Sequence, residues 1–137
     1  LAVDFAPFKE LNDLPLGMTA HLVYEAFDTA PATISSKLMA MIRKDIGFDG
    51  LIMTDDISMQ ALKGTMTERS TASIAAGCDV VLHCNGDMAQ MQDVVAASGL
   101  MTDSAQKRAE AALAARKTPK SVDIEALSAE LEGYLSG

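Results

Sequence analysis

GFDGLIMTDDISM, residues 47–59, is the most informative stretch of this chain. Its apolar run, Leu51–Met53, shows no alternation of apolar and polar residues and is soon followed by two adjacent carboxylates, Asp55 and Asp56. Such a run indicates a strand that is buried on both faces, and buried strands of this kind are usually parallel. Parallel strands collect reactive side chains beyond their carboxyl ends. One of the two carboxylates is therefore a catalytic candidate, and the alternative is an acidic loop cap without chemistry.

Outward from this strand, the sequence repeats a rhythm of strand and helix. Ser35 is a suitable N-cap for a helix, and Gly47 and Gly77 are suitable helix ends. A break at Pro119 separates two tail helices. The pattern indicates an α/β fold built from three consecutive βα units. Strands are expected at about residues 14–22, 51–54 and 79–84, and helices at about 35–46, 68–76, 88–97, 103–116 and 123–135.

Composition limits the possible partners. The chain has 137 residues, 49% of them hydrophobic, which is enough for one core and indicates one domain or part of one. A formal charge of −8 argues against nucleic acid and anionic membranes, because both need a basic surface. No apolar run approaches the ~20 residues that span a bilayer. The chain opens with Leu1 and no signal segment, so we expect a truncated chain from which a leader could have been lost.

The two cysteines, Cys78 and Cys84, flank the third expected strand. At ~3.3 Å per residue their α-carbons are about 20 Å apart, far beyond the ~7 Å that a disulfide allows. We expect both to be reduced and buried, which is consistent with a cytoplasmic location. A zinc site at His83 and Cys84 has little support, because neighbouring strand residues point to opposite faces and no second ligand pair follows.

The stretch at residues 47–59 resembles the nucleophile motif of glycoside hydrolase family 3, and in particular that of its single-domain bacterial β-N-acetylhexosaminidases. The typical motif is Gly-Phe-x-Gly-x-(Ile/Val)-x-(Thr/Ser)-Asp-Asp-(Leu/Ile)-x-Met. Other segments follow in the family's order, and together the resemblance covers roughly residues 12–116. These segments are LPLGMTAH at 14–21, PATIS at 31–35, Glu68-Arg69, AGCD at 76–79 and Cys84-Asn85.

The resemblance implies the C-terminal part of a (β/α)₈ TIM barrel. A complete barrel needs ~250 residues, so this chain would hold about the last three βα units and the terminal helices. Residues 1–117 would be the C-terminal portion of the barrel domain, and residues 118–137 a terminal amphipathic helix that packs on it. The first strand would leave an unpaired edge, and the missing N-terminal part of the barrel would be the partner of this fragment. A small, complete, three-stranded α/β domain is the structural alternative.

The family's chemistry is retaining glycoside hydrolysis, in which a carboxylate attacks the anomeric carbon and a second group protonates the leaving oxygen. Asp55 aligns with the family's nucleophile. Asp56 cannot share the face of Asp55 on strand geometry, so we interpret it as a partner for an Arg or for loop amides.

The proton-transfer partner of the family is absent from this chain. Relatives use a His, oriented by an Asp, in a mobile loop near a Lys-His-x-x-Gly-His-Gly segment, and no such segment occurs here. His21 lines the pocket floor and binds substrate, or hydrogen-bonds a neighbouring loop, or is a core histidine with its hydrogen bonds satisfied. His83 is interpreted as structural. We therefore expect the fragment to be inactive alone.

Weaker candidates surround the nucleophile. Met18 and Met59 are candidate substrate-binding residues, although core filling is the usual use of methionine. Asn85 follows the third strand and is a candidate substrate-binding residue on the rim of the barrel, where it either orients Asp55 or builds the turn. Arg69, beside Glu68 at a helix start, is interpreted as part of a surface ion pair.

Three hypotheses for function follow. The first is a cytoplasmic β-N-acetylhexosaminidase that removes terminal, non-reducing β-linked N-acetylglucosamine from a small carbohydrate of the muropeptide type in peptidoglycan recycling, without a metal or cofactor. The second is a β-glucosidase or β-xylosidase relative, although Thr54-Asp55-Asp56 replaces the usual Ser-Asp-Trp. The third is a non-catalytic α/β fragment or interaction module. Mg²⁺ bound by Asp55 and Asp56 is a further alternative, but no phosphate-binding loop accompanies the pair.

Overall fold

The computed structural model describes residues 2–136, and its centre is a three-stranded parallel sheet. The strands are β1 (Leu16–Met18), β2 (Leu51–Asp56) and β3 (Val80–Leu82), in the order β1-β2-β3. Met18 pairs with Met53, which in turn pairs with Val80, and the register shifts before Asp56 pairs with Leu82. The prediction of a parallel sheet is confirmed, although β1 and β3 are shorter than the sequence indicated.

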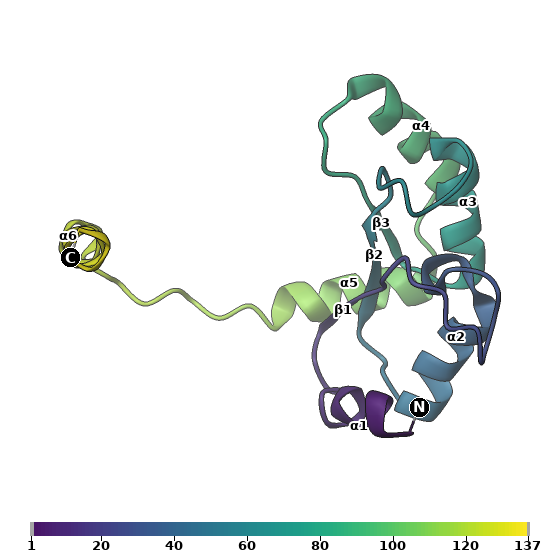
Figure 1. Ribbon diagram of the computed structural model, residues 1–137, viewed down its shortest axis with the longest axis horizontal. Helices are drawn as coiled ribbons and strands as arrows, with labels where there is room; N and C mark the ends of the chain where they lie inside the picture. Colours follow the sequence, from purple (N-terminus) through teal and green to yellow (C-terminus); the bar gives the residue numbers. More distant parts are fainter. Residues whose placement is uncertain (1, 137) are drawn as a thin grey trace.

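Helices connect and follow the strands (Figure 1). The prediction of five helices after the first strand is confirmed, with their ends within a few residues of those expected. Each helix that follows a strand lies on the same side of the sheet in Figure 1. The helices are α1 (Ala2–Glu10), α2 (Ser36–Met41), α3 (Met66–Ala76), α4 (Met88–Ser98), α5 (Asp103–Ala114) and α6 (Ile124–Leu135), with a 3₁₀ turn η1 (Ala32–Ile34) and a π-helical turn η2 (Ile42–Ile46) that continues α2.

The helix ends use the chemistry that the sequence indicated. The Ser35 hydroxyl accepts the amide of Leu38 at 3.2 Å and caps α2. Gly47 ends the following π-helical turn at a φ of 79°, a left-handed conformation that glycine adopts without a steric penalty. Thr65 and Glu68 form a reciprocal capping box at the start of α3. These local signals explain why the helix positions could be predicted closely.

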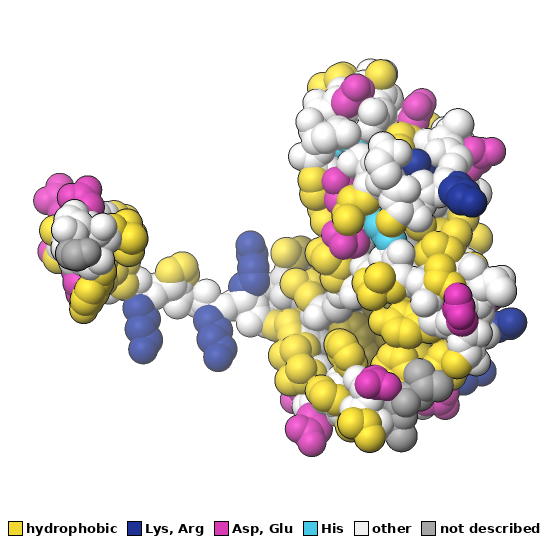
Figure 2. Space-filling view, in the orientation of Figure 1, with side chains coloured by type: hydrophobic (Ala, Val, Ile, Leu, Met, Phe, Trp, Pro, Cys, Tyr) yellow, Lys and Arg dark blue, Asp and Glu magenta, His cyan; other side chains and the backbone are white. Residues whose placement is uncertain are grey.

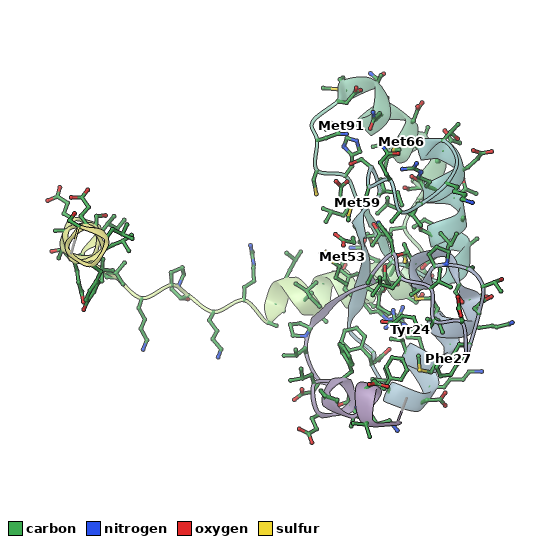
Figure 3. The ribbon with its side chains drawn as sticks, viewed as in Figure 1. Tyr24, Phe27, Met53, Met59, Met66 and Met91 are labelled. Atoms are coloured by element: carbon green, nitrogen blue, oxygen red, sulfur yellow. The ribbon has the colours of Figure 1, made fainter. Side chains whose placement is uncertain are left out.

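Helix α1 was not anticipated, and it contains Pro7, a residue that disfavours a helix interior. Aromatic packing explains its presence. The ring of Phe5 lies 5.8 Å from that of Tyr24 and 5.9 Å from that of Phe27, measured between centroids. Figure 3 shows Tyr24 and Phe27 close to α1. A tertiary contact therefore outweighs the local preference.

One face of the sheet is covered by helices and the other is open. Ile52 packs with Met39 of α2 and Ala76 of α3 in one core cluster, and Ile57 packs with Val94 of α4 in a second. The side chains that alternate with Ile52 on β2 lie on the opposite face. On the neighbouring strand, Leu16 and Met18 share that opposite face by their register and are about half exposed. The expectation of a strand buried on both faces holds fully for the helix side, whereas on the opposite face Leu51 is buried and Met53 and Asp55 are half-buried.

An ion-pair network ties the amino ends of β2 and β3 to two helical segments. The side chain of Asp79 is 6% exposed and accepts Arg43 Nη2 at 2.8 Å and Arg108 Nη1 at 3.0 Å. It also accepts the backbone amide of Ile52 at 2.9 Å. Arg108 further donates to the backbone oxygen of Asp49, which anchors α5 across this end of the sheet.

Helix α6 stands apart from this body at the end of an extended tether, residues 115–123 (Figure 1). Every residue described in α6 is exposed, including the apolar series Ile124, Leu127, Leu131 and Leu135. Figure 2 shows hydrophobic side chains along one side of this helix. The expected packing of residues 118–137 is therefore not seen against the body of this chain, because the tether holds the apolar stripe away from it. Packing on a complete barrel stays a prediction.

None of the helices within residues 2–136 is both long enough and apolar enough to cross a membrane.

Candidate active site

Asp55 lies at the carboxyl end of β2, on the open face of the sheet. Along the strand, Met53 and Asp55 alternate with the buried residues Ile52 and Thr54, so the carboxylate points away from the helix side. Asp55 is half-buried. It therefore occupies the edge where parallel α/β folds carry their reactive groups, and it faces away from the apolar interior.

The backbone around Asp55 is held on both flanks. Its amide donates to the oxygen of Thr19 on the β1 side at 3.2 Å, and the amide of Ile57 donates to the oxygen of Leu82 on the β3 side at 2.8 Å. The amide of Asp56 donates to Asp55 Oδ1 at 2.8 Å. Within residues 2–136 no hydrogen bond is made to Oδ2, which leaves that oxygen available to a ligand.

Asp56 is turned to the loops, as the alternation of the strand predicted. Its carboxylate accepts the amide and the hydroxyl of Ser58 at 3.0 and 2.7 Å and the amide of Cys84 at 3.2 Å. Burial raises the pKa of Asp56, but the hydrogen bonds from Ser58 and Cys84 outweigh it and hold the pKa below its ordinary value. The interpretation of Asp56 as a partner for loop amides is confirmed.

His21 is a buried histidine, 8% exposed, that links the loop after β1 to the end of β2. Its Nδ1 lies 2.7 Å from the hydroxyl of Thr33, and its Nε2 lies 3.0 Å from the backbone oxygen of Asp56. Thr33 in turn lies 2.9 Å from the hydroxyl of Thr19. Both ring nitrogens are thus engaged within the chain, which supports the hydrogen-bonded core interpretation and leaves neither nitrogen free for a substrate.

Two methionines lie close to the carboxylate with exposed side chains. Met18 is 55% exposed and, by its register with Met53, shares the open face with Asp55. Met59 is 43% exposed and lies beyond the end of β2, past Met53 (Figure 3). Neither is a core residue here, so the core-filling alternative does not hold for them.

Asn85 and His83 belong to the turn between β3 and α4. Asn85 accepts the amide of Asp87 at 3.1 Å and donates to Gln90 Oε1 at 3.1 Å. His83 Nε2 lies 3.0 Å from the same Gln90 oxygen. These contacts favour the turn-building role for Asn85 and agree with a structural role for His83.

Arg69 differs from its expected surface position. It is 8% exposed, and its Nη1 donates to the backbone oxygens of Ile57 and Met59 at 3.0 and 3.1 Å. Its neighbour Glu68 is engaged in the capping box. The expectation of a surface ion pair was wrong, because the first turn of α3 faces the loop that follows Asp55. No pattern in the sequence around Arg69 could have predicted this tertiary contact.

The cysteines are both free, but only Cys78 is buried. Cys84 lies beyond β3 and is exposed, so the expectation that both are buried was wrong for Cys84. Among residues 2–136, no group of three or more His, Cys, Asp or Glu side chains is arranged to hold a metal ion.

The cavities lie away from Asp55. A cavity of about 700 Å³ is bordered by residues of α2, α3, α4 and α5, and a hollow of about 400 Å³ lies between α5 and the amino ends of β1 and β2. Neither is lined by Asp55 or Asp56. Asp55 therefore lies on the open face of the sheet, outside both of these cavities.

A sequence profile described as "Glycosyl hydrolase family 3 N terminal domain" matches residues 1–114.

Individual relatives carry a consistent name. A protein from Nitrosomonas eutropha named β-hexosaminidase is 42% identical over 87 residues, which is 60% of this chain and 25% of that protein. One of the same name from Chromobacterium violaceum is 45% identical over 87 residues, covering 60% of this chain and 24% of that protein. The chain thus spans about a quarter to a third of the length of the relatives that it matches.

Solved structures are similar over most of the chain. Native NagZ from Neisseria gonorrhoeae has a TM-score of 0.68 and 31% identity, covering 93% of this chain and 36% of that chain. A β-N-acetylglucosaminidase from Thermotoga maritima has a TM-score of 0.66 and 25% identity, covering 85% of this chain and 29% of that chain.

Proposed function

Because the chain belongs to glycosyl hydrolase family 3, we propose that it is part of a retaining glycoside hydrolase that removes terminal, non-reducing β-linked N-acetylglucosamine. The observation that carries the proposal is the position of Asp55, a half-buried carboxylate at the carboxyl end of a parallel strand, with one oxygen held by an amide and the other free of partners within residues 2–136. We infer the identity of the sugar from the names of the similar proteins, β-hexosaminidase and β-N-acetylglucosaminidase.

In the proposed reaction an oxygen of ionised Asp55 attacks C1 of the sugar. The bond from C1 to the leaving oxygen breaks, and that oxygen takes a proton from a general acid that the residues of this chain do not supply. Water then attacks C1, loses a proton to the same group acting as base, and releases the carboxylate. The backbone ties to Thr19 and Leu82 limit how far Asp55 can move.

The remaining substrate contacts are assigned to exposed side chains. Met18 and Met59 offer apolar, polarisable surface to a sugar face or an acetamido methyl group. Asn85 supports the rim through its turn. His21 supports the backbone of Asp56. None of these roles needs a metal or a cofactor.

We also propose that the sheet belongs to a (β/α)₈ barrel, with the other strands supplied by residues outside this chain. Two features support this. Within residues 2–136, β1 has a neighbour on one side only, and the face that carries Asp55 is open. In a closed barrel that face would line the interior, and Asp55 would stand at its carboxyl rim.

The proposed substrate is a muropeptide-type saccharide of peptidoglycan recycling, and the proposed location is the cytoplasm. Both follow from the resemblance to single-domain bacterial β-N-acetylhexosaminidases. The two free cysteines are compatible with a reducing compartment.

A chimera tests the activity. Residues 12–116 would replace the aligned segment of Neisseria gonorrhoeae NagZ, which supplies the rest of that protein. We expect the chimera to hydrolyse an aryl β-N-acetylglucosaminide, and we expect Asp55→Asn to lower kcat/KM by at least about 10³-fold, because it removes the attacking group. Asp93→Asn, an exposed carboxylate on α4, is the matched control.

Two further measurements sharpen the result. A fluorinated N-acetylglucosaminide should label Asp55 in a peptide digest, and an aryl β-glucoside or β-xyloside should be a much poorer substrate. Preference for the glucoside would move the assignment to the β-glucosidase branch. An active chimera that keeps its turnover after Asp55→Asn would overturn the proposal.

A further inference from the structure

Two arginines bind the loops at the two ends of β2 with the same pattern of hydrogen bonds. Near the amino end, Arg43 Nη1 donates to the backbone oxygens of Phe48 and Gly50 at 3.0 and 2.7 Å. Beyond the carboxyl end, Arg69 Nη1 donates to the backbone oxygens of Ile57 and Met59 at 3.0 and 3.1 Å. Each guanidinium thus holds a short loop next to the strand that carries Asp55.

The two arginines differ in how their charge is compensated. Arg43 pairs with the buried carboxylate of Asp79 at 2.8 Å. Arg69 is more buried, has no ion pair within residues 2–136, and keeps a buried Nε without a hydrogen-bond partner. A buried guanidinium without an ion pair loses its hydration with no opposite charge to offset the loss, and its Nε is a buried donor without a partner. The cost of Arg69 indicates a task that an apolar side chain cannot perform.

The loop that Arg69 holds is also held by Asp56 from the other side. The amide of Ser58 donates to Asp56 Oδ1 at 3.0 Å, and the amide of Met59 donates to the Asp56 oxygen at 3.1 Å. Ile57 itself is fully buried, and its amide donates to Leu82 at 2.8 Å. The loop of residues 57–59 therefore donates hydrogen bonds to Asp56 at the end of β2 and accepts hydrogen bonds from Arg69 on α3.

We propose that Arg69 is a positioning residue for Asp55, acting through the backbone of residues 57–59; this rests on the function proposed above. Because Arg69 holds the loop immediately after β2, it fixes the position of the Asp55 carboxylate at the end of that strand. Both bonds come from Nη1, whose two hydrogens are fixed in the plane of the guanidinium, whereas the hydrogens of an ammonium group rotate at the end of a flexible stem. Displacing a reacting group by ~1 Å can cost about 10²-fold in rate.

The first test uses this chain and needs no activity. Amide hydrogen exchange is measured at Ile57, Ser58 and Met59 in Arg69→Lys, with Ile52 as an internal reference for global opening, and in the matched variant Arg43→Lys, with the unsubstituted chain as reference because the Ile52 amide shares Asp79 with Arg43. We expect Arg69→Lys to speed exchange at the three loop amides at least tenfold more than at Ile52, and Arg43→Lys to leave the three loop amides within about threefold of the unsubstituted chain. Arg69→Gln, which is neutral, repeats the test without a buried ammonium.

Loop amides that stay within twofold of the Ile52 change in both Arg69 variants would overturn the proposal. This measurement stands whether or not the glycosidase assignment survives.

The second test uses the chimera. We expect Arg69→Lys to lower kcat and the rate of covalent labelling of Asp55 at least tenfold, because the nucleophile is misplaced. KM should change less than kcat, because Met18 on β1 keeps its place although Met59 lies in the loop that is loosened. Arg43→Lys should keep kcat per folded molecule. Equal kcat losses in the two variants would overturn the positioning role, whereas an active chimera in which Asp55→Asn has no effect would overturn the proposed function alone.

Discussion

The Nε2 atom of His21 lies 3.0 Å from the backbone oxygen of Asp56, so a side chain from the loop after β1 holds the main chain at the end of β2. A carbonyl oxygen only accepts hydrogen bonds, which assigns the proton to Nε2. In the neutral ring Nδ1 is then left to accept from Thr33 at 2.7 Å. Asp56, the neighbour of the proposed nucleophile, is thereby tied to the loop after β1 and to the η1 turn.

Replacing His21 should loosen this tie. We expect His21→Phe to lower the free energy of unfolding by about 1–3 kcal/mol, because the Asp56 oxygen and the Thr33 hydroxyl lose their partner in a buried setting. Urea denaturation of the 137-residue chain measures the change. His83→Phe, which removes one hydrogen bond to Gln90 at a half-buried site, should cost less than about 1 kcal/mol. Equal losses in the two variants would contradict the assigned difference.

Removing the carboxylate of Asp79 should have a larger effect. It pairs with Arg43 and Arg108 and is 6% exposed, so Asp79→Ala leaves two guanidinium groups without their common partner. Breaking a buried ion pair from one side typically costs about 3–5 kcal/mol. Guanidinium chloride denaturation checks this. Asp49→Ala is the control, since its carboxylate is exposed and its contact with Arg108 is 3.4 Å, and it should change stability by less than about 1 kcal/mol.

Acid should weaken the loop after Asp55. The pKa of Asp56 is lowered in the folded protein, so the unfolded chain binds more protons than the folded chain as pH falls through the range between the two values. The stabilisation by Asp56 is therefore complete above an unfolded pKa of about 3.9 and is lost as pH drops through the lower folded value. Amide exchange at Ser58 and Cys84, expressed as protection relative to the intrinsic exchange rate at each pH, should show this loosening as a loss of protection below pH 5. Asp56→Asn should remove the pH dependence of the protection at both amides, and a pH-dependent protection that persists in this variant would assign it to another group.

The two thiols should react at very different rates. Burial raises the pKa of Cys78 to about 12, so almost no thiolate forms at neutral pH, and the side chain is shielded from reagents. Cys84 is exposed. A thiol reagent at pH 8 should therefore modify one cysteine per folded chain rapidly and the second only after unfolding, with peptide mapping to identify Cys84 as the first. Fast modification of Cys78 in folded protein would show that the α2–α3 core opens readily.

Several features followed from residue order alone. The apolar run before Asp55 predicts a strand because it lacks alternation with polar residues. The helix ends follow from the capping side chain of Ser35 and from the backbone freedom of Gly47 and Gly77. The opposite orientations of Asp55 and Asp56 also follow, because side chains alternate along any strand. These features depend on residues that are close together in the sequence, which is why they could be predicted from the sequence alone.

Other features required the folded chain. The burial of Arg69, the bridge from His21 to Asp56 and the exposure of Cys84 each depend on contacts between residues that are far apart in sequence or on where a strand ends. Helix α1 exists despite Pro7 because Phe5 meets two aromatic rings from a later loop. Helix α6 carries an apolar stripe that its own sequence displays, yet only the arrangement in space reveals that nothing in the described body covers it. Local pattern specifies which residues can form an element, whereas burial is decided by what the rest of the chain brings against it.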